Sequence, residues 1–200
     1  MKKKTIYISL VILFITCMLL VITDNTILVD EQVHNFLYRD NLVETMKIIT
    51  FFGGTIGIPL ITGIVFIILF LKNKRRDAFG LIIVVVSVTI INYIAKILIA
   101  RERPEYILIN ESLYSFPSGH AMGSTALYGY IIYLIIKSTL NTKNKAILTS
   151  LFALLIISIG ISRIILGAHY FSDILGGIVL STMIIIIYYE INKHLENKNK

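Results

Sequence analysis

Residues 162–173, SRIILGAHYFSD, separate two long apolar segments in the second half of the chain. Ionisable side chains at the end of an apolar segment usually line a cavity or mark a functional site. His169 and Asp173 are spaced i, i+4, so on a helix they would share a face and could form a hydrogen bond. A carboxylate that binds one imidazole nitrogen leaves the other nitrogen free to react. The planar donors of Arg163 suit a phosphoryl group. A polar patch that caps one helix and starts the next would contain the same residue types.

The composition is that of a membrane protein. Hydrophobic residues make up 56% of the 200 residues and the mean hydropathy is +0.81, whereas soluble domains are about 45–50% apolar. Several apolar segments have the length of a spanning helix. We therefore expect an all-α fold, an integral membrane bundle of six transmembrane helices in a single domain covering residues 1–200. The predicted spans are residues 6–22, 51–71, 79–100, 121–136, 146–161 and 174–189.

The N-terminal part of the chain contains an apolar segment, residues 6–22, followed by a mixed segment, residues 23–50. Lys2–Lys4 precede the first apolar segment as in a signal peptide, but the segment is long for one and no A-x-A-like site follows, so we expect a retained span. Residues 23–50 mix apolar and charged side chains at helical spacing, which predicts an interfacial helix on the membrane surface with a solvated or interfacial His34. Gly53 and Gly57 predict close helix packing in the second span.

The basic residues predict the orientation of the bundle. With the N-terminus in the cytoplasm, most of them fall on the cytoplasmic side of the plasma membrane, as the positive-inside rule requires. These basic segments are residues 2–4, 72–76, 137–145 and 193–200. Both termini are then cytoplasmic. The basic residues behind the formal charge of +7 are distributed as this topology requires, and this distribution argues against nucleic-acid binding.

Six ionisable side chains fall together on the outer side: Lys96, Arg103, His120, Arg163, His169 and Asp173. Cations in this number suit a doubly charged oxyanion. Two histidines can divide a phosphoryl transfer, because one attacks phosphorus while the other protonates the leaving oxygen. The sequence contains no cluster of acidic residues that would predict a metal site, so no cofactor is expected. The cations would stabilise the phosphoryl oxygens instead.

His120 ends the motif Pro117-Ser118-Gly119-His120. A proline and a capping serine are typical of a helix start, where free backbone N–H groups bind anions. A plain helix start explains the proline and the serine but leaves His120 unexplained.

Three segments resemble the signatures of a known family. They are Lys96 with six residues before Arg103-Pro104, the motif Pro117–His120, and Ser162-Arg163 followed by His169 and Asp173. In this order they resemble the type-2 phosphatidic acid phosphatase superfamily, whose phosphate site is shared with vanadium haloperoxidases. The signature-bearing core covers residues 96–173. The resemblance implies a six-helix membrane bundle with its site at the outer face.

The resemblance also implies a role for each residue. His169 would be the nucleophile that forms a phosphohistidine, Asp173 would orient it, and His120 would be the general acid. The phosphate oxygens would be held by Lys96, Arg103, Ser118, Gly119 and Arg163. Ser162 belongs to the signature without an assigned role.

The family implies a lipid phosphate or diphosphate as substrate, such as phosphatidic acid, phosphatidylglycerol phosphate or undecaprenyl diphosphate. An outward site slightly favours undecaprenyl diphosphate, because that carrier is released outside the cell. A transporter would also place charges within a bundle, and a non-catalytic lipid-binding relative would share the fold, but neither requires both His120 and His169. A soluble haloperoxidase is excluded by the apolar spans. The oligomeric state is left open.

Overall fold

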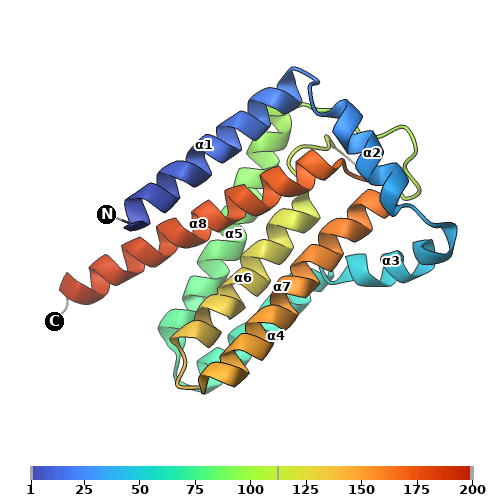
Figure 1. Ribbon diagram of the computed structural model, residues 1–200. Coiled ribbons are helices and arrows are strands. Elements are labelled where there is room, and N and C mark those ends of the chain that lie inside the picture. Colours follow the sequence, from blue (N-terminus) through green and yellow to red (C-terminus); the bar gives the residue numbers. More distant parts are fainter. Residues whose placement is uncertain (1, 112, 199–200) are drawn as a thin grey trace.

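A computed structural model describes residues 2–111 and 113–198, which form α-helices and one short 3-10 helix (Figure 1). The predicted all-α class is confirmed. The elements are α1 (Lys2–Ile22), α2 (Ile27–Leu37), η1 (Asp40–Leu42), α3 (Val43–Phe51), α4 (Gly57–Leu71), α5 (Arg75–Ile99), α6 (Gly119–Lys137), α7 (Thr142–Ile165) and α8 (Phe171–Lys198).

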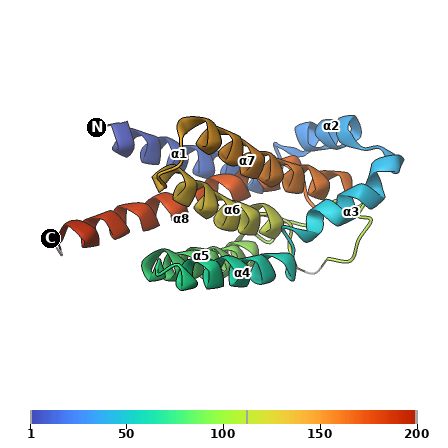
Figure 2. The same ribbon diagram turned by 90° about the horizontal axis from the view of Figure 1, so that it is seen from below.

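Helix α6 forms the centre of the bundle. It packs against α5, α7 and α8, while α1 lies along α8 and α4 lies along α5. Figure 2 shows α4 and α5 on one side of the bundle and α1 and α7 on the other, with α6 and α8 between them. The main core is made of apolar side chains from these helices and includes Leu81, Val84, Met122, Leu127 and Ile159.

Within the described residues, α5, α7 and α8 are long and apolar enough to cross a membrane. The segments Tyr7–Ile22 and Ile27–Leu37 pass the same test only as a pair bent by 94°, which gives three or four candidate spans rather than the predicted six. The other two predicted spans correspond to α4, which has 15 residues, and to α6, which carries buried polar side chains such as Ser124 and Thr125. Because α6 is surrounded by other helices, it needs no continuous apolar surface toward lipid.

The predicted span 51–71 is shorter in the structure, because α3 ends at Phe51, α4 begins at Gly57 and a turn separates them. A Cβ atom at Gly53 would lie 2.5 Å from Cγ2 of Ile159, so only glycine lets this turn approach α7. A Cβ atom at Gly57 would lie 2.0 Å from the carbonyl oxygen of Phe51. Gly53 therefore makes the predicted close approach to another helix, but from a tight turn rather than from within a span, and Gly57 belongs to the turn itself.

Helix α2 follows α1, where the interfacial helix was predicted, and packs against α7 and α8 at one end of the bundle (Figure 1). The expectation of a solvated His34 is wrong. Its Nδ1 lies 2.9 Å from the carbonyl oxygen of Ile164, and its ring stacks on Tyr106 with 3.9 Å between centroids. Asp30 is buried on the same face, with 1% exposure. The helical spacing of apolar and charged residues did not reveal that α2 turns the face with Asp30 and His34 toward the protein.

Candidate active site

The predicted site residues come together where the ends of α5 and α7 meet the starts of α6 and α8. Lys96 lies in the last turn of α5, and Arg163 lies in the last turn of α7. Gly119 begins α6, and Asp173 lies in the first turn of α8. His169 lies in the turn that connects α7 to α8. Residues that are far apart in the sequence thus surround one end of the bundle.

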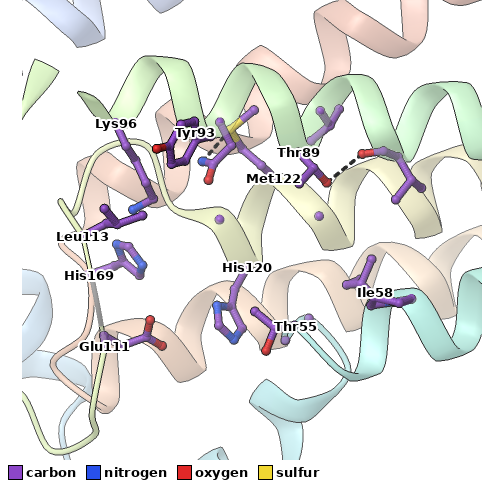
Figure 3. Close-up of a pocket in the computed structure, with 18 of the residues that line it drawn as sticks. Thr55, Ile58, Thr89, Tyr93, Lys96, Glu111, Leu113, His120, Met122 and His169 are labelled. Atoms are coloured by element: carbon purple, nitrogen blue, oxygen red, sulfur yellow. Dashed lines mark hydrogen bonds between the residues drawn. The ribbon is translucent and has the colours of Figure 1, made fainter. Parts of the chain in front are cut away.

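A cavity of about 380 Å³ opens here. Five of the predicted site residues line it, namely Lys96, Arg103, Gly119, His120 and His169. Its wall continues over apolar side chains of α4 and α5, which include Ile58, Pro59, Val85 and Val88. Figure 3 shows the imidazole rings of His120 and His169 extending toward the same space, with Glu111 beside them. The cavity therefore combines a polar, cationic end with an apolar wall.

A Schellman motif ends α7 and turns the chain toward the cavity. The N–H of Gly167 donates to the carbonyl oxygen of Ile164, and the N–H of Ala168 donates to that of Arg163, both at 3.0 Å, as this motif requires. Gly167 has a φ of +65°, which glycine adopts at the least cost. The N–H of His169 also donates to the carbonyl oxygen of Arg163, at 3.2 Å, so the turn fixes the backbone of His169.

His169 and Asp173 form the predicted pair. Asp173 Oδ2 lies 3.2 Å from His169 Nδ1 and accepts the N–H of Tyr170 at 3.0 Å. Both side chains are buried, with exposures of 2% and 0%. Burial, followed by the positive charges of Arg163 and Lys96, holds the pKa of His169 well below its usual value. The imidazole is therefore neutral, and the carboxylate beside Nδ1 favours the tautomer that carries its proton there, which leaves Nε2 unprotonated.

Glu111 lies between two of the predicted phosphate-binding residues. Its carboxylate forms an ion pair with Arg163 Nη2, and its Oε2 lies 3.6 Å from Arg103 Nη2. Arg103 Nη1 also donates to the carbonyl oxygen of Ala168 at 2.6 Å and lies 3.3 Å from His169 Nε2. The carboxylate of Glu111 thus lies between the two arginines that were predicted to bind phosphate.

Lys96 and Ser118 have local partners. The Lys96 ammonium group donates to the carbonyl oxygen of Tyr114, and to that of Ser115 at 3.3 Å, which ties α5 to the segment before α6. Ser118 caps α6 as predicted, because its Oγ accepts the N–H of Ala121 at 3.4 Å. The free N–H groups of this helix start add to the positive potential of the site.

His120 lies in the first turn of α6, next to the glycine turn between α3 and α4. A Cβ atom at Gly54 would lie 3.4 Å from His120 Nε2, and one at Gly53 would lie 3.3 Å from its carbonyl oxygen. The absence of side chains at these glycines leaves room for the imidazole at the edge of the cavity.

Metal ligands are not gathered in the part of the chain that the structure describes, where no group of three or more His, Cys, Asp or Glu side chains lies together. The charged groups at the cavity are suited to an oxyanion, because Arg103 and Arg163 offer planar donors and Lys96 adds a third cation.

Two further charged residues, Glu111 and Arg101, contact the predicted site and were not predicted from the sequence. Glu111 belongs to the same polar segment as Glu102 and Glu105, and nothing in the sequence sets it apart from them. Arg101 looks like one more basic residue outside the membrane, yet it forms an ion pair with Asp173. Only the contacts in the folded chain distinguish these two residues.

The sequence is similar to known lipid phosphatases. Residues 77–196 match the family model described as the PAP2 superfamily. The chain is 32% identical over 149 residues to phosphatidylglycerophosphatase B of Bacillus subtilis (strain 168), and the match covers 73% of each protein. It is 29% identical over 91 residues to lipid phosphate phosphatase delta of Arabidopsis thaliana, which is 44% of this chain and 22% of that protein.

The fold is also similar to solved structures. The crystal structure of a transmembrane PAP2-type phosphatidylglycerolphosphate phosphatase from Bacillus subtilis matches with a TM-score of 0.86 and 26% identity, over 94% of this chain and 96% of that one. The crystal structure of Aquifex aeolicus LpxE shares the fold, with a TM-score of 0.66 and 18% identity over 82% of this chain and 94% of that one. The chain is therefore an integral membrane protein with several transmembrane helices, as predicted.

Proposed function

This chain belongs to the PAP2 superfamily, and from that membership we propose that it is a membrane lipid phosphate phosphatase, a hydrolase of phosphoric monoesters. The observation that carries the proposal is the cavity, in which His169, His120 and cations meet an apolar wall. A phosphate group fits the cationic end, while an acyl or isoprenoid chain fits the wall. The three signature segments predicted this family from the sequence.

In the first step of the proposed reaction, His169 Nε2 attacks the phosphorus atom and forms a phosphohistidine. The phosphorus–oxygen bond to the lipid breaks, and His120 gives its proton to the departing oxygen. Asp173 accepts the Nδ1 proton of His169 in a hydrogen bond and stabilises the positive charge that develops on the ring.

In the second step, a water molecule attacks the phosphohistidine and the phosphorus–nitrogen bond breaks. His120 accepts a proton from this water, which returns both histidines to their starting states and releases inorganic phosphate. Preorganised donors aimed at the phosphoryl oxygens stabilise both transition states. These donors are Lys96, Arg103, Arg163 and the helix start at Ser118 and Gly119.

Substrate must displace the Glu111 carboxylate from Arg103 and Arg163. We therefore expect Glu111→Gln to bind orthovanadate, a mimic of five-coordinate phosphorus, about 3–10-fold more tightly, because a partly exposed ion pair is worth about 1 kcal/mol. Inhibition constants measured in detergent test this. Glu105→Gln, which neutralises an exposed glutamate of the same segment, is the matched control. Weaker vanadate binding by Glu111→Gln would mean that Glu111 positions the arginines rather than competing with phosphate.

We propose that α1, α4, α5, α6, α7 and α8, which run side by side in Figure 1, each cross the membrane within one domain. Both termini are then cytoplasmic and the site faces outward. In a Cys17→Ala background, Leu108→Cys, whose side chain is 45% exposed near the site, should react with an impermeant maleimide in intact cells. Lys143→Cys, on the opposite side, should react only after permeabilisation. The reverse pattern would invert this orientation.

Phosphatidylglycerol phosphate and undecaprenyl diphosphate are the two candidate substrates. The outward site suits undecaprenyl diphosphate. The similarity to phosphatidylglycerophosphatase B favours phosphatidylglycerol phosphate, and this is the substrate that we propose to be turned over faster. An apolar wall discriminates between chains by only about 1–3 kcal/mol per methylene, so we expect both lipids to be accepted.

Phosphate release by the purified protein tests the proposal. In detergent with a chelator, the protein should hydrolyse phosphatidylglycerol phosphate, phosphatidic acid and undecaprenyl diphosphate, and kcat/KM ranks them. A requirement for magnesium would overturn the role given to the cations. Binding of these lipids without any phosphate release would instead identify a non-catalytic binding or transport protein.

A further inference from the structure

Arg101, which takes no part in the steps above, lies in a buried hydrogen-bond network beside the site. Its Nη1 donates to Asp173 Oδ1 at 2.6 Å and to Ser172 Oγ at 2.8 Å. Its Nη2 donates to Asp30 Oδ2 at 2.9 Å and to Thr26 Oγ1 at 3.0 Å. A single guanidinium group therefore joins the start of α8 to the N-terminal end of α2.

Asp30 completes the network from the side of α2. Its Oδ1 accepts the N–H of Ser172 at 2.8 Å, and its Oδ2 accepts the Ser172 hydroxyl at 2.7 Å. The exposures of these two residues are 1% and 5%, so the bonds lie away from solvent. The ring of Tyr170 covers the guanidinium of Arg101, whose Cζ lies 4.0 Å from the ring centroid. The guanidinium is thus held at both ends and covered on one face.

The two oxygens of Asp173 have separate partners. Oδ1 accepts from Arg101, while Oδ2 lies beside His169 Nδ1 and accepts the N–H of Tyr170. A buried carboxylate is costly unless its charge is compensated. Without Arg101, Asp173 would become protonated or rotate, and either change would weaken its hydrogen bond to His169.

Arg101 and Arg103 are two residues apart but face different surroundings. Arg103 lines the cavity, whereas Arg101 is absent from its lining and directs its donors to α2 and α8. Loss of Arg103 removes a group that touches phosphate. Loss of Arg101 leaves the phosphate contacts in place and removes a support of the catalytic pair.

We propose that Arg101 is a positioning residue that holds Asp173 in the orientation His169 requires and is itself anchored to α2 by Asp30. The proposal rests on the proposed function, since it takes His169 as the nucleophile that Asp173 orients. It also gives α2 a part in the site, because the helix fixes the partner of the catalytic carboxylate from outside the cavity.

The first test is Arg101→Gln. Loss of a group that orients a metal-binding histidine from the outer shell costs about 10–100-fold, and by the same physical argument we expect kcat for lipid phosphate to fall by about that factor. KM should stay within about threefold, because the interaction acts on the chemical step. Arg103→Gln removes a proposed donor to the phosphoryl group itself, so it should both lower kcat and raise KM. Arg39→Gln, an exposed arginine that bonds only to main-chain carbonyl groups in the described structure, is the matched control and should keep wild-type kinetics.

A double-mutant cycle separates positioning from a general loss of stability. In an Asp173→Asn background, Arg101→Gln should lower kcat little further, because the carboxylate through which Arg101 acts has already been replaced by a neutral amide. Equal losses in both backgrounds, or a folded Arg101→Gln protein with unchanged kcat, would overturn the proposal.

NMR of histidine ring nitrogens labelled with nitrogen-15 reports on the His169–Asp173 pair without any turnover of substrate. Arg101→Gln should shift the His169 ring signals, which a His169→Gln sample identifies. If the wild type releases no phosphate but His169 still responds, the proposed function fails and the positioning role stands. Unchanged His169 signals would refute the positioning role. If Arg101→Gln does not fold, Asp30→Asn, which preserves the shape of the side chain, takes its place. It should likewise shift the His169 ring signals and lower kcat, and a folded Asp30→Asn protein that does neither would refute the positioning role.

Discussion

His169→Ala is expected to abolish phosphate release from lipid phosphates, with a loss of at least about 10³-fold, as for removal of a covalent nucleophile. The structure gives the reason. His169 is neutral, its Nδ1 faces Asp173 and its Nε2 lies beside Arg103 at the cavity. The methyl side chain of alanine cannot accept the phosphoryl group, so the two-step path is lost while the cationic end of the cavity remains.

Reactions quenched in alkaline detergent, with the label in the phosphate group of the lipid, measure this directly. The wild type should trap an acid-labile, base-stable phosphoenzyme, and His169→Ala should trap none. His194→Ala, an exposed histidine on α8, is the matched control and should behave as the wild type. The assignment fails if folded His169→Ala protein keeps near-normal turnover or still forms the phosphoenzyme.

The candidate site was largely readable from the sequence, because its parts are set by short-range features of the chain. Ser118 caps a helix, and Gly167 follows one in the left-handed conformation, so local chain geometry places the neighbouring His120 and His169. Asp173 is near enough in sequence to reach His169 once the next helix begins. The bundle then has only to bring these short segments to the same end.

The network of Arg101 could not be read in this way. Arg101 is separated by 71 residues from Asp30 and by 72 from Asp173. Each is an ordinary charged residue on its own, and periodicity treats the charges of α2 as a solvated face. The pairing depends on how α2 packs across α7 and α8, which is a long-range property that one sequence does not reveal.

The fold shows the same limit. Apolar content predicts where helices lie but not where they break, so residues 51–71 look like one continuous span although α4 begins only at Gly57. At this break Gly53 approaches Ile159 closely, and Gly54 leaves room beside the imidazole of His120. A hydropathy average is insensitive to such contacts. Residues 121–136 were also predicted to span the membrane, but buried polar side chains lower the apolar content of α6, which is not among the candidate spans of the described residues.

His120→Ala is expected to slow formation of the phosphoenzyme by about 10²–10⁴-fold, the usual contribution of a general acid. The size of the loss should depend on the leaving group. Phosphatidylglycerol phosphate expels an alkoxide, which needs a proton, whereas undecaprenyl diphosphate expels a phosphate, which is a better leaving group. The structure motivates this role because His120 reaches the cavity from α6 while His169 reaches it from the turn between α7 and α8.

Single-turnover rates of the same His120→Ala protein with both lipids test the acid role without a change of sample. Phosphoenzyme formation must be measured rather than kcat, because His120 is also the proposed base of the second step. The loss should be greater for phosphatidylglycerol phosphate, and it should shrink for an activated aryl phosphate whose leaving group needs no proton. If all three substrates lose rate equally, His120 binds the phosphoryl group instead of protonating the leaving oxygen, and the proton must come from elsewhere in the site.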